Sequence, residues 1–191
     1  LLESLLLIEE GVRIEDIDRA LTLLGMPIGP ITLLDEVGID VGAHVMSGNM
    51  AELLIGREGF KINYSMPKMF EAGLHGRKAK KGFYNYAMKK GRLRKTLPNQ
   101  DVYQYFGNPS PKKIDRKEIE ERTMLMLLNE AVWCIEDNIL QNPKDGDIGG
   151  VFGVGFLPWS GGPFSYMNLL GLDHVVNKME HYASIHGPKF N

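Results

Sequence analysis

Nine of the Lys and Arg residues in this sequence lie between positions 77 and 95, with no acid among them. The rest of the chain then carries 13 basic residues against 24 acidic ones. A run of this kind is most often a solvated linker. The alternative is that it binds anions, either a phosphate group or an acidic lipid surface.

A glycine-rich segment at 149–156 has spacings similar to those of a phosphate-binding loop. A dinucleotide fingerprint requires a preceding strand and a βαβ unit. This segment instead follows a predicted helix and Pro143. We therefore predict that these glycines allow close packing between helices.

The titratable residues form no recognisable catalytic or metal-binding pattern. His174 and His181 lie seven residues apart on one predicted helix. Two helical turns separate such positions by about 10 Å, too far to share one metal, so we assign no metal site. Cys134 lies in an apolar run typical of a buried, inert thiol. The acid pairs Glu9-Glu10 and Asp35-Glu36 are interpreted as helix-end charges. We assign no catalytic residue.

Composition places the chain among ordinary soluble globular proteins. It has 191 residues, 43% apolar and 24% charged, with a formal net charge of −2. This charge argues against nucleic acid as the main partner. A single cysteine excludes an internal disulfide and fits a reducing compartment. No segment approaches the roughly 18 apolar residues of a membrane span.

Apolar periodicity together with Gly and Pro punctuation predicts an all-α chain. Asp115 and Glu118 form a capping-box pattern before a long helix over 116–138. Residues 82–86 are expected to be extended, and residues 87–114 to be a linker or long excursion. The other expected helices cover 1–10, 14–24, 30–37, about 40–45, 65–72, a stretch starting with Asp147 as cap, one starting at Pro163, and a last one capped by Asp173 and reaching toward His186.

The chain also contains an internal repeat. A Gly-Pro pair is followed by Gly after eight residues and Asp after ten, in both halves, and an Asp-Ile pair precedes each block. We predict two helical units, residues 1–88 and 116–191, joined by a linker over 89–115. Because each unit is too small to bury much core alone, we expect them to pack about a pseudo-twofold axis. The corresponding positions are Gly29-Pro30, Gly38, Asp40 and Asp16-Ile17 in the first copy, and Gly162-Pro163, Gly171, Asp173 and Asp147-Ile148 in the second.

These segments resemble the C-terminal region of 3-hydroxyacyl-CoA dehydrogenases, and most closely the multifunctional α-subunits of fatty-acid β-oxidation complexes. The resemblance covers nearly all of the chain outside 87–114. Two positions depart from the family pattern. This chain has Lys80 where the family usually has Gly, and Leu157 where the family usually has Pro. The motifs that carry the resemblance are Glu15-Asp16-Ile17-Asp18, the stretch from Gly25 to Asp40, Gly76-Arg77-Lys78, Lys81-Gly82-Phe83-Tyr84, Asn129-Glu130-Ala131, the stretch from Gly146 to Phe156, and Gly161-Gly162-Pro163-Phe164.

The resemblance implies an oxidoreductase that converts (3S)-3-hydroxyacyl-CoA into 3-oxoacyl-CoA with NAD⁺, in a parent that is also an enoyl-CoA hydratase. In the family, the NAD-binding Rossmann domain and the catalytic residues belong to the region that precedes this one. The chain is therefore interpreted as part of a longer protein, and this part alone is expected to bind no cofactor and to be inactive. By analogy, Met26, Pro27, Ile28 and Pro30 would line the acyl-chain side of the cleft. The alternative is that these four residues are ordinary core.

The partners implied are this Rossmann domain, an acyl-CoA substrate and a thiolase β-subunit, in a mitochondrial matrix or bacterial cytoplasm. A CoA phosphate then becomes one ligand that the basic run could bind. The competing interpretation is a non-enzymatic helical scaffold that docks partner subunits. The helical domain of another Rossmann-type dehydrogenase is a third, but it lacks the second-copy motif.

Overall fold

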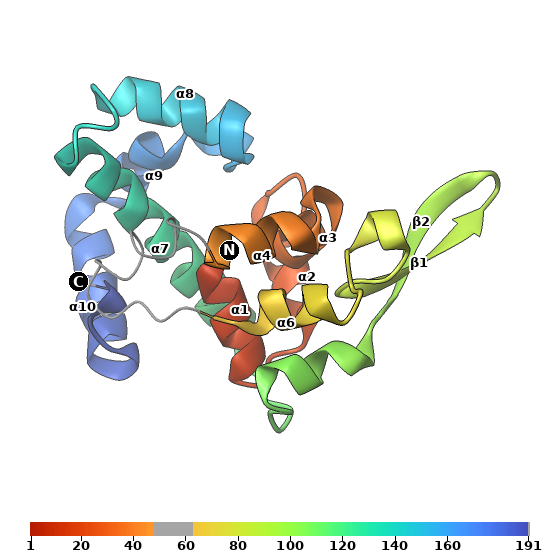
Figure 1. The fold of residues 1–191 in the computed structure, drawn as a ribbon. Coiled ribbons are helices and arrows are strands. Elements are labelled where there is room, and N and C mark those ends of the chain that lie inside the picture. The colour runs from red at the N-terminus through yellow and green to blue at the C-terminus, as the bar shows by residue number, and fades with distance from the viewer. Residues whose placement is uncertain (48–62, 191) are drawn as a thin grey trace.

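The structure, a computed structural model, is described for residues 1–47 and 63–190, and it is mostly helical (Figure 1). This confirms the predicted all-α class, with one two-stranded hairpin added. Within the described ranges, no helix is long and apolar enough to cross a membrane. The α-helices are α1 Leu2–Glu9, α2 Ile14–Leu24, α3 Pro30–Val37, α4 Ile39–Ser47, α6 Ser65–Glu71, α7 Arg116–Glu136, α8 Pro143–Val154, α9 Pro163–Leu170 and α10 Leu172–His186. The strands are β1 Tyr84–Lys89 and β2 Arg92–Pro98, and short 3-10 turns cover Arg77–Ala79, Gln100–Phe106, Pro158–Ser160 and Pro188–Phe190.

The Gly-Pro pairs begin helices as predicted. Pro30 and Pro163 occupy the first helical positions. A missing N–H costs nothing there, and the fixed φ of proline suits the helix. Each helix ends after eight residues at a glycine with positive φ, 110° at Gly38 and 87° at Gly171. Glycine adopts this backbone without the steric cost that a Cβ would bring.

Three predicted helix starts need correction. Asp147 does not cap α8, because this helix begins four residues earlier at Pro143 and is capped by Asn142, whose side chain accepts from the Asp145 amide. Asp40 and Asp173 lie in the first turns of α4 and α10 rather than at their caps. The local sequence pattern did not distinguish an Asp at the N-cap from an Asp in the first turn, because Asp is favourable at both positions.

The long helix α7 starts as predicted. The Asp115 side chain accepts a 2.7 Å hydrogen bond from the Lys117 amide. Glu118 does not complete a capping box among the contacts of the described residues but lies 3.6 Å from Arg122 one turn on. The helix then ends at Glu136, before the predicted residue 138.

The glycine-rich segment lies in α8 and not in a phosphate loop. A Cβ on Gly150 would come within 2.6 Å of Pro163 Cδ, and one on Gly146 within 2.4 Å of the Phe164 ring. The predicted close packing is therefore correct for Gly150, and Gly146, outside the predicted segment, likewise lets α9 approach α8. Gly149 and Gly153 face open space instead.

The segment predicted to be a linker is ordered and contributes to the core. Strand β2 pairs with β1 in antiparallel register, so the predicted boundary at 88 falls inside β1. Lys90 and Gly91 form the tip, both with positive φ. Two positive φ angles in succession are typical of a type I′ turn. Farther along, the Tyr103 hydroxyl accepts from the Ile14 amide and the Lys112 amide donates to the Gly11 carbonyl. Figure 1 shows the hairpin projecting from the body on the side away from α8 and α10.

Helix α7 joins the two halves of the chain. It contacts α1 and α2 on one side and α9 and α10 on the other (Figure 1), and its buried residues belong to the same apolar cluster as those of α1 and α2. The Arg122 guanidinium is fully buried and bonds to Glu3 and Glu10 of the first half. Glu3 is also bound by Lys189 near the end of the chain, at 2.6 Å.

We predict that Arg122→Met lowers the free energy of unfolding by about 3–5 kcal/mol, because it leaves the buried carboxylates without their main partner. Met has nearly the helix propensity of Arg, so propensity does not confound the result. The measurement is urea unfolding followed by circular dichroism. The matched control is Arg116→Met, which removes an exposed cation of the same helix that lies 3.4 Å from the half-buried Glu120. Its loss should be below about 1 kcal/mol. Equal losses in the two variants would contradict the role of Arg122.

Candidate functional site

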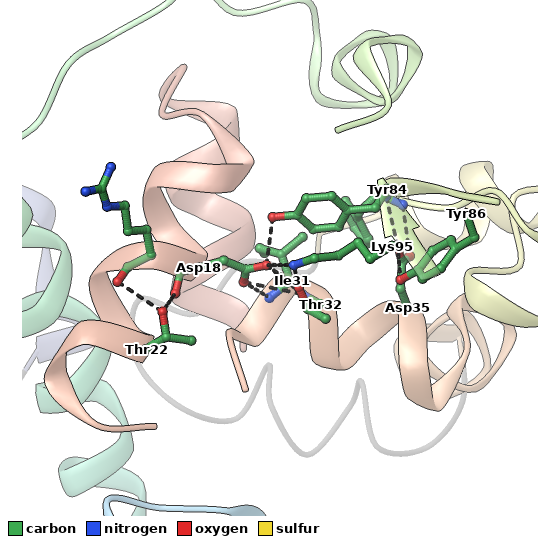
Figure 2. Close-up of polar contacts among 10 residues, drawn as sticks. Asp18, Thr22, Ile31, Thr32, Asp35, Tyr84, Tyr86 and Lys95 are labelled. Atoms are coloured by element: carbon green, nitrogen blue, oxygen red, sulfur yellow. Dashed lines mark hydrogen bonds and ion pairs between the residues drawn. The ribbon is translucent and has the colours of Figure 1, made fainter. Parts of the chain in front are cut away.

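The turn at residues 25–30, which joins α2 to α3, is held by the buried carboxylate of Asp18 (Figure 2). Oδ1 of Asp18 accepts from the Ile31 amide at 2.8 Å, and Oδ2 accepts from the Thr32 amide at 3.0 Å and from the Thr32 hydroxyl. These amides are unpaired donors of the first turn of α3. Asp18 therefore caps a helix that lies 13 residues farther along the chain.

Gly29 lets the turn approach Asp18. A Cβ at position 29 would lie 2.4 Å from Asp18 Cγ, a distance that no side chain can adopt without displacing the carboxylate. The Gly-Pro pair therefore has two separate physical roles: Gly29 makes room for the capping carboxylate, and Pro30 starts the helix that it caps.

The four residues predicted to line an acyl cleft lie on this turn in different environments. Pro30 is buried at the start of α3, Met26 and Ile28 are half-buried, and Pro27 is exposed. Met26 packs against the main core. Two of the four, Pro27 and Ile28, thus have solvent-accessible surface that another molecule or domain could contact.

A residue of the second half covers the start of the turn. The Trp159 indole N–H donates to the Leu24 carbonyl at 3.0 Å, and its ring closely approaches Gly25. Sequence reasoning missed this contact, because the two residues are 135 positions apart and nothing local to either one signals it.

A second buried carboxylate, Asp35, anchors strand β1 to α3. Its Oδ1 accepts from the Phe83 amide at 2.9 Å, and its Oδ2 accepts from the Tyr84 amide at 2.8 Å and the Tyr86 hydroxyl at 3.1 Å. Asp35 lies near the end of α3 as predicted, but its carboxylate is buried and binds β1. Burial raises the pKa of Asp35 to about 6, against the opposing effect of these hydrogen bonds.

The other predicted helix-end acids also have specific partners. Glu10 is bound by Arg122, which holds its pKa below the usual value in spite of the opposing effect of burial. Glu36 makes an ion pair with Arg77 at 2.7 Å. These contacts were not visible in the sequence because the partners lie 112 and 41 residues away.

Tyr84 connects the two anchors. Its amide binds Asp35 and its hydroxyl donates to Asp18 at 2.8 Å, while Lys95 lies 4.1 Å from the centre of its ring (Figure 2). Burial, followed by the neighbouring Asp18 charge, holds the pKa of Tyr84 well above its usual value. Because the oxygens of both carboxylates accept from fixed donors, this arrangement positions the turn and offers no free general base.

The second half repeats the cap. Asp147 accepts from the Phe164 amide at 2.7 Å, from the Ser165 amide at 3.2 Å and from the Ser165 hydroxyl at 2.6 Å, and a Cβ on Gly162 would collide with it. Asp147 thus corresponds to Asp18. The sequence repeat had paired Asp147 with Asp16, and that pairing is wrong. Asp16 instead pairs with Arg13 on the surface.

An open pocket of about 290 Å³ lies where the end of α2 meets α7, α9 and α10. Lys178 and Tyr182 bind Glu121 beside it, at 2.9 and 2.7 Å, and together they hold the pKa of Glu121 below its usual value although burial acts in the opposite direction. None of the four predicted cleft residues lines it. Its lining is Leu24, Lys117, Glu120, Glu121, Met124, Leu125, Leu128, Tyr166, Leu170, His174, Val175 and Lys178.

Among the described residues, no group of three His, Cys, Asp or Glu is placed to hold a metal ion. His174 and His181 are exposed on α10, and Cys134 is half-buried in α7. The site is therefore a shaped, apolar turn fixed by carboxylates, without an assembled set of reactive groups in the described part of the chain.

Residues 1–86, which include this turn, match the family model described as 3-hydroxyacyl-CoA dehydrogenase, C-terminal domain. The resemblance stated from the motifs is thereby confirmed.

Curated relatives extend the match to the rest of the chain. The fatty acid oxidation complex subunit alpha of Shewanella sp. (strain ANA-3) is 43% identical over 189 residues, which is 98% of this chain and 26% of that protein. The protein of the same name from Vibrio campbellii (strain ATCC BAA-1116) is 44% identical over 177 residues, 93% of this chain and 24% of that protein. The chain thus spans about a quarter of the length of these relatives.

Two solved structures share the fold. The 3-hydroxybutyryl-CoA dehydrogenase of Escherichia coli K12 superposes with a TM-score of 0.74 at 18% identity, covering 99% of this chain and 55% of that one. The dehydrogenase part of multifunctional enzyme 1 from C. elegans gives 0.60 at 21% identity, covering 96% and 41%.

The pH dependence of stability tests the environment of Asp35. Because its folded pKa of about 6 lies above the ordinary 3.8, the native state binds more protons than the unfolded state between these values. The contribution of Asp35 to stability is therefore fully present below about pH 4 and lost as the pH rises through about 6. We predict that the stability advantage of the wild type over Asp35→Asn shrinks by up to about 3 kcal/mol over this range in urea unfolding.

Asp40→Asn is the control of opposite sign. Lys78 holds the pKa of Asp40 below its ordinary value, so its contribution is present at neutral pH and lost as the pH falls. If Asp35→Asn does not fold, carboxyl-carbon NMR of the wild type gives the Asp35 pKa directly. A value at or below 3.8 would contradict the prediction.

Proposed function

We propose that this chain is the C-terminal part of an NAD-dependent (3S)-3-hydroxyacyl-CoA dehydrogenase, within a multifunctional α subunit that also carries an enoyl-CoA hydratase. The observation that carries the proposal is the 43% identity to a fatty acid oxidation complex subunit alpha, which runs through both halves and covers 98% of the chain. The reaction is 3-hydroxyacyl-CoA + NAD⁺ → 3-oxoacyl-CoA + NADH + H⁺, in a cycle of fatty-acid oxidation.

The described residues do not fit an NAD site. A dinucleotide fold needs a strand, a glycine loop and a helix in sequence. The glycines from 146 to 153 are instead part of α8. In the parent, a base would take the hydroxyl proton while hydride leaves C3 for the nicotinamide. We assign both the base and the cofactor to the region of the parent that precedes this chain, and we propose no catalytic or cofactor-binding residue here.

The contribution of this chain to that reaction is the acyl side of the substrate cleft. We place it at the turn of Met26, Pro27, Ile28 and Pro30, which is apolar and held rigid by Asp18. Because a preformed wall loses little conformational entropy when a ligand binds, such a turn suits the positioning of a flexible acyl chain. Ile28 and Pro27 are the members that a substrate could contact without displacing the core.

The second contribution is an internal pseudo-dimer. We propose that the two halves pack as a pseudo-twofold pair that supports the cofactor domain. The equivalent carboxylate caps, Asp18 and Asp147, and the buried Arg122 contacts between α7 and α1 support this arrangement.

The parent's partners follow from its proposed place in the complex. They are the acyl-CoA substrate, its own Rossmann domain and a thiolase β-subunit. Since the curated relatives named above are bacterial, we propose the bacterial cytoplasm rather than the mitochondrial matrix as the compartment.

We predict that the purified chain forms no NADH from 3-hydroxybutyryl-CoA or a long-chain 3-hydroxyacyl-CoA, measured by absorbance, since the proposed base and cofactor site belong to the preceding region. Removing this chain from the parent should abolish the dehydrogenase activity as well. If the parent without it keeps an unchanged kcat/KM, the scaffold interpretation is correct instead.

We predict that Ile28→Trp in the parent lowers kcat/KM for long-chain substrates about tenfold or more and leaves that for 3-hydroxybutyryl-CoA within about twofold, because the larger ring narrows the acyl path beyond the reacting carbon. The control is Leu23→Trp, at an exposed position of α2. Equal effects on short and long substrates would mean that the turn is ordinary core.

A further inference from the structure

The basic run at 77–95 divides into paired and unpaired residues in the structure. At the base of the hairpin, Arg77, Lys78 and Lys81 make ion pairs with Glu36, Asp40 and Asp101, and Lys95 donates to Thr32. The remaining five have no acidic partner among the contacts of the described residues. They are Lys80, Lys89, Lys90, Arg92 and Arg94, and all are exposed.

Strand register gathers three of these on one face. Lys89 pairs directly with Arg92, and Ala87 pairs with Arg94. Because side chains alternate along a strand, Lys89, Arg92 and Arg94 project from the same side of the hairpin. Like charges directly opposite each other on neighbouring strands are destabilising. The hairpin therefore keeps an unfavourable charge arrangement that no acid of the described chain relieves.

The opposite face is apolar toward the tip. Tyr86 is buried against Asp35 at the base, and Met88, opposite Leu93, is 60% exposed near the tip. The outer hairpin thus combines cations that lack a described acidic partner with the solvated apolar side chain of Met88.

The tip itself carries charge at a conformational cost. Lys90 adopts a left-handed backbone, with positive φ. This position of a type I′ turn favours Asn or Gly. Asn would suit the turn better but would remove a positive charge. A Lys at this position, together with the repulsion between Lys89 and Arg92, indicates that the positive charge of the hairpin binds a ligand outside the chain.

We propose that the β1–β2 hairpin enters an anionic lipid surface tip first, so that Lys90 at the tip and Lys89, Arg92 and Arg94 on one face meet the headgroup phosphates while Met88 on the other face reaches the interfacial apolar layer. A projecting hairpin fits an extended surface, whereas a small phosphorylated ligand is usually held in a concavity. The rest of the chain is negative overall. An anionic surface therefore attracts the hairpin and repels the body, which fixes the orientation. This inference does not depend on the proposed dehydrogenase function.

The test is cosedimentation of the chain with vesicles of phosphatidylcholine alone or with about one third phosphatidylserine. We expect binding to the anionic vesicles that falls steeply as NaCl rises from about 0.05 to about 0.5 M. The triple variant Lys89→Gln, Arg92→Gln, Arg94→Gln should lower the partition coefficient roughly 100-fold. Its melting temperature should not fall, because the substitution removes repulsion.

The matched control neutralises three exposed cations elsewhere, Arg19→Gln, Lys113→Gln and Lys144→Gln. It changes the net charge equally and should alter partitioning by less than about threefold. Lys90→Asn should weaken binding about fivefold while the melting temperature stays the same or rises. Met88→Ser should weaken binding to vesicles without weakening any binding to duplex DNA.

Each contrary outcome overturns the proposal. Equal binding by the wild type and the triple hairpin variant would show that the hairpin is not the docking surface. An equal loss of vesicle binding in the control variant would show that binding depends on the net charge of the chain and not on the hairpin. Duplex DNA or soluble tripolyphosphate bound more tightly than the anionic vesicles, with Met88→Ser without effect on the vesicles, would assign the cations to a soluble polyanion.

Discussion

The packing of the two halves of this chain against each other depends on the ion pairs of the buried Arg122 guanidinium. A charge removed from water is tolerated only where carboxylates replace the lost hydration. Here Glu3 of α1 and the following Glu10 do so. Lys189 binds Glu3 from the far end of the chain. Any shift of α7 against α1 would leave one of these charges buried without a partner. This requirement makes the register of the two helices specific in a way that apolar packing alone would not.

Buried or half-buried carboxylates also fix contacts between other elements of the chain. Asp18 and Asp147 cap helices that begin more than ten residues away, and Asp35 holds β1 against α3. In each case the oxygens meet fixed amide or hydroxyl donors, so these groups set geometry and do not transfer protons in a reaction. That property fits the role proposed for this chain, in which it shapes a substrate cleft and the reacting groups come from elsewhere in the parent.

The interior and the surface of the chain treat charge in opposite ways. Inside, cations and carboxylates are matched, as at Arg122 and Glu3. On the outer hairpin, Lys89 faces Arg92 with no acidic partner among the described residues, and Lys90 occupies a backbone conformation that favours another residue. Unmatched charge in a strained turn is unfavourable for folding, and this contrast is what directs attention to a ligand outside the chain.

Sequence by itself determined the features that depend on neighbours within a few residues. The starts of α3 and α9 at Pro30 and Pro163, the end of α3 at Gly38, the Asp115 cap and the resemblance of residues 1–86 to the matching family were predicted from local motifs and are confirmed. Local signals placed Asp35 near a helix end but did not show that its carboxylate is buried.

Only the tertiary structure decided which residues meet across long separations. The Glu3–Arg122 pair spans 119 residues and the Trp159–Leu24 contact 135, while the equivalence of Asp147 with Asp18 rests on caps at different separations, 17 and 13 residues. Helix starts and stops follow from backbone sterics that a short segment already contains. The partner of a buried charge is set by where the folded chain excludes water, and no local pattern records that.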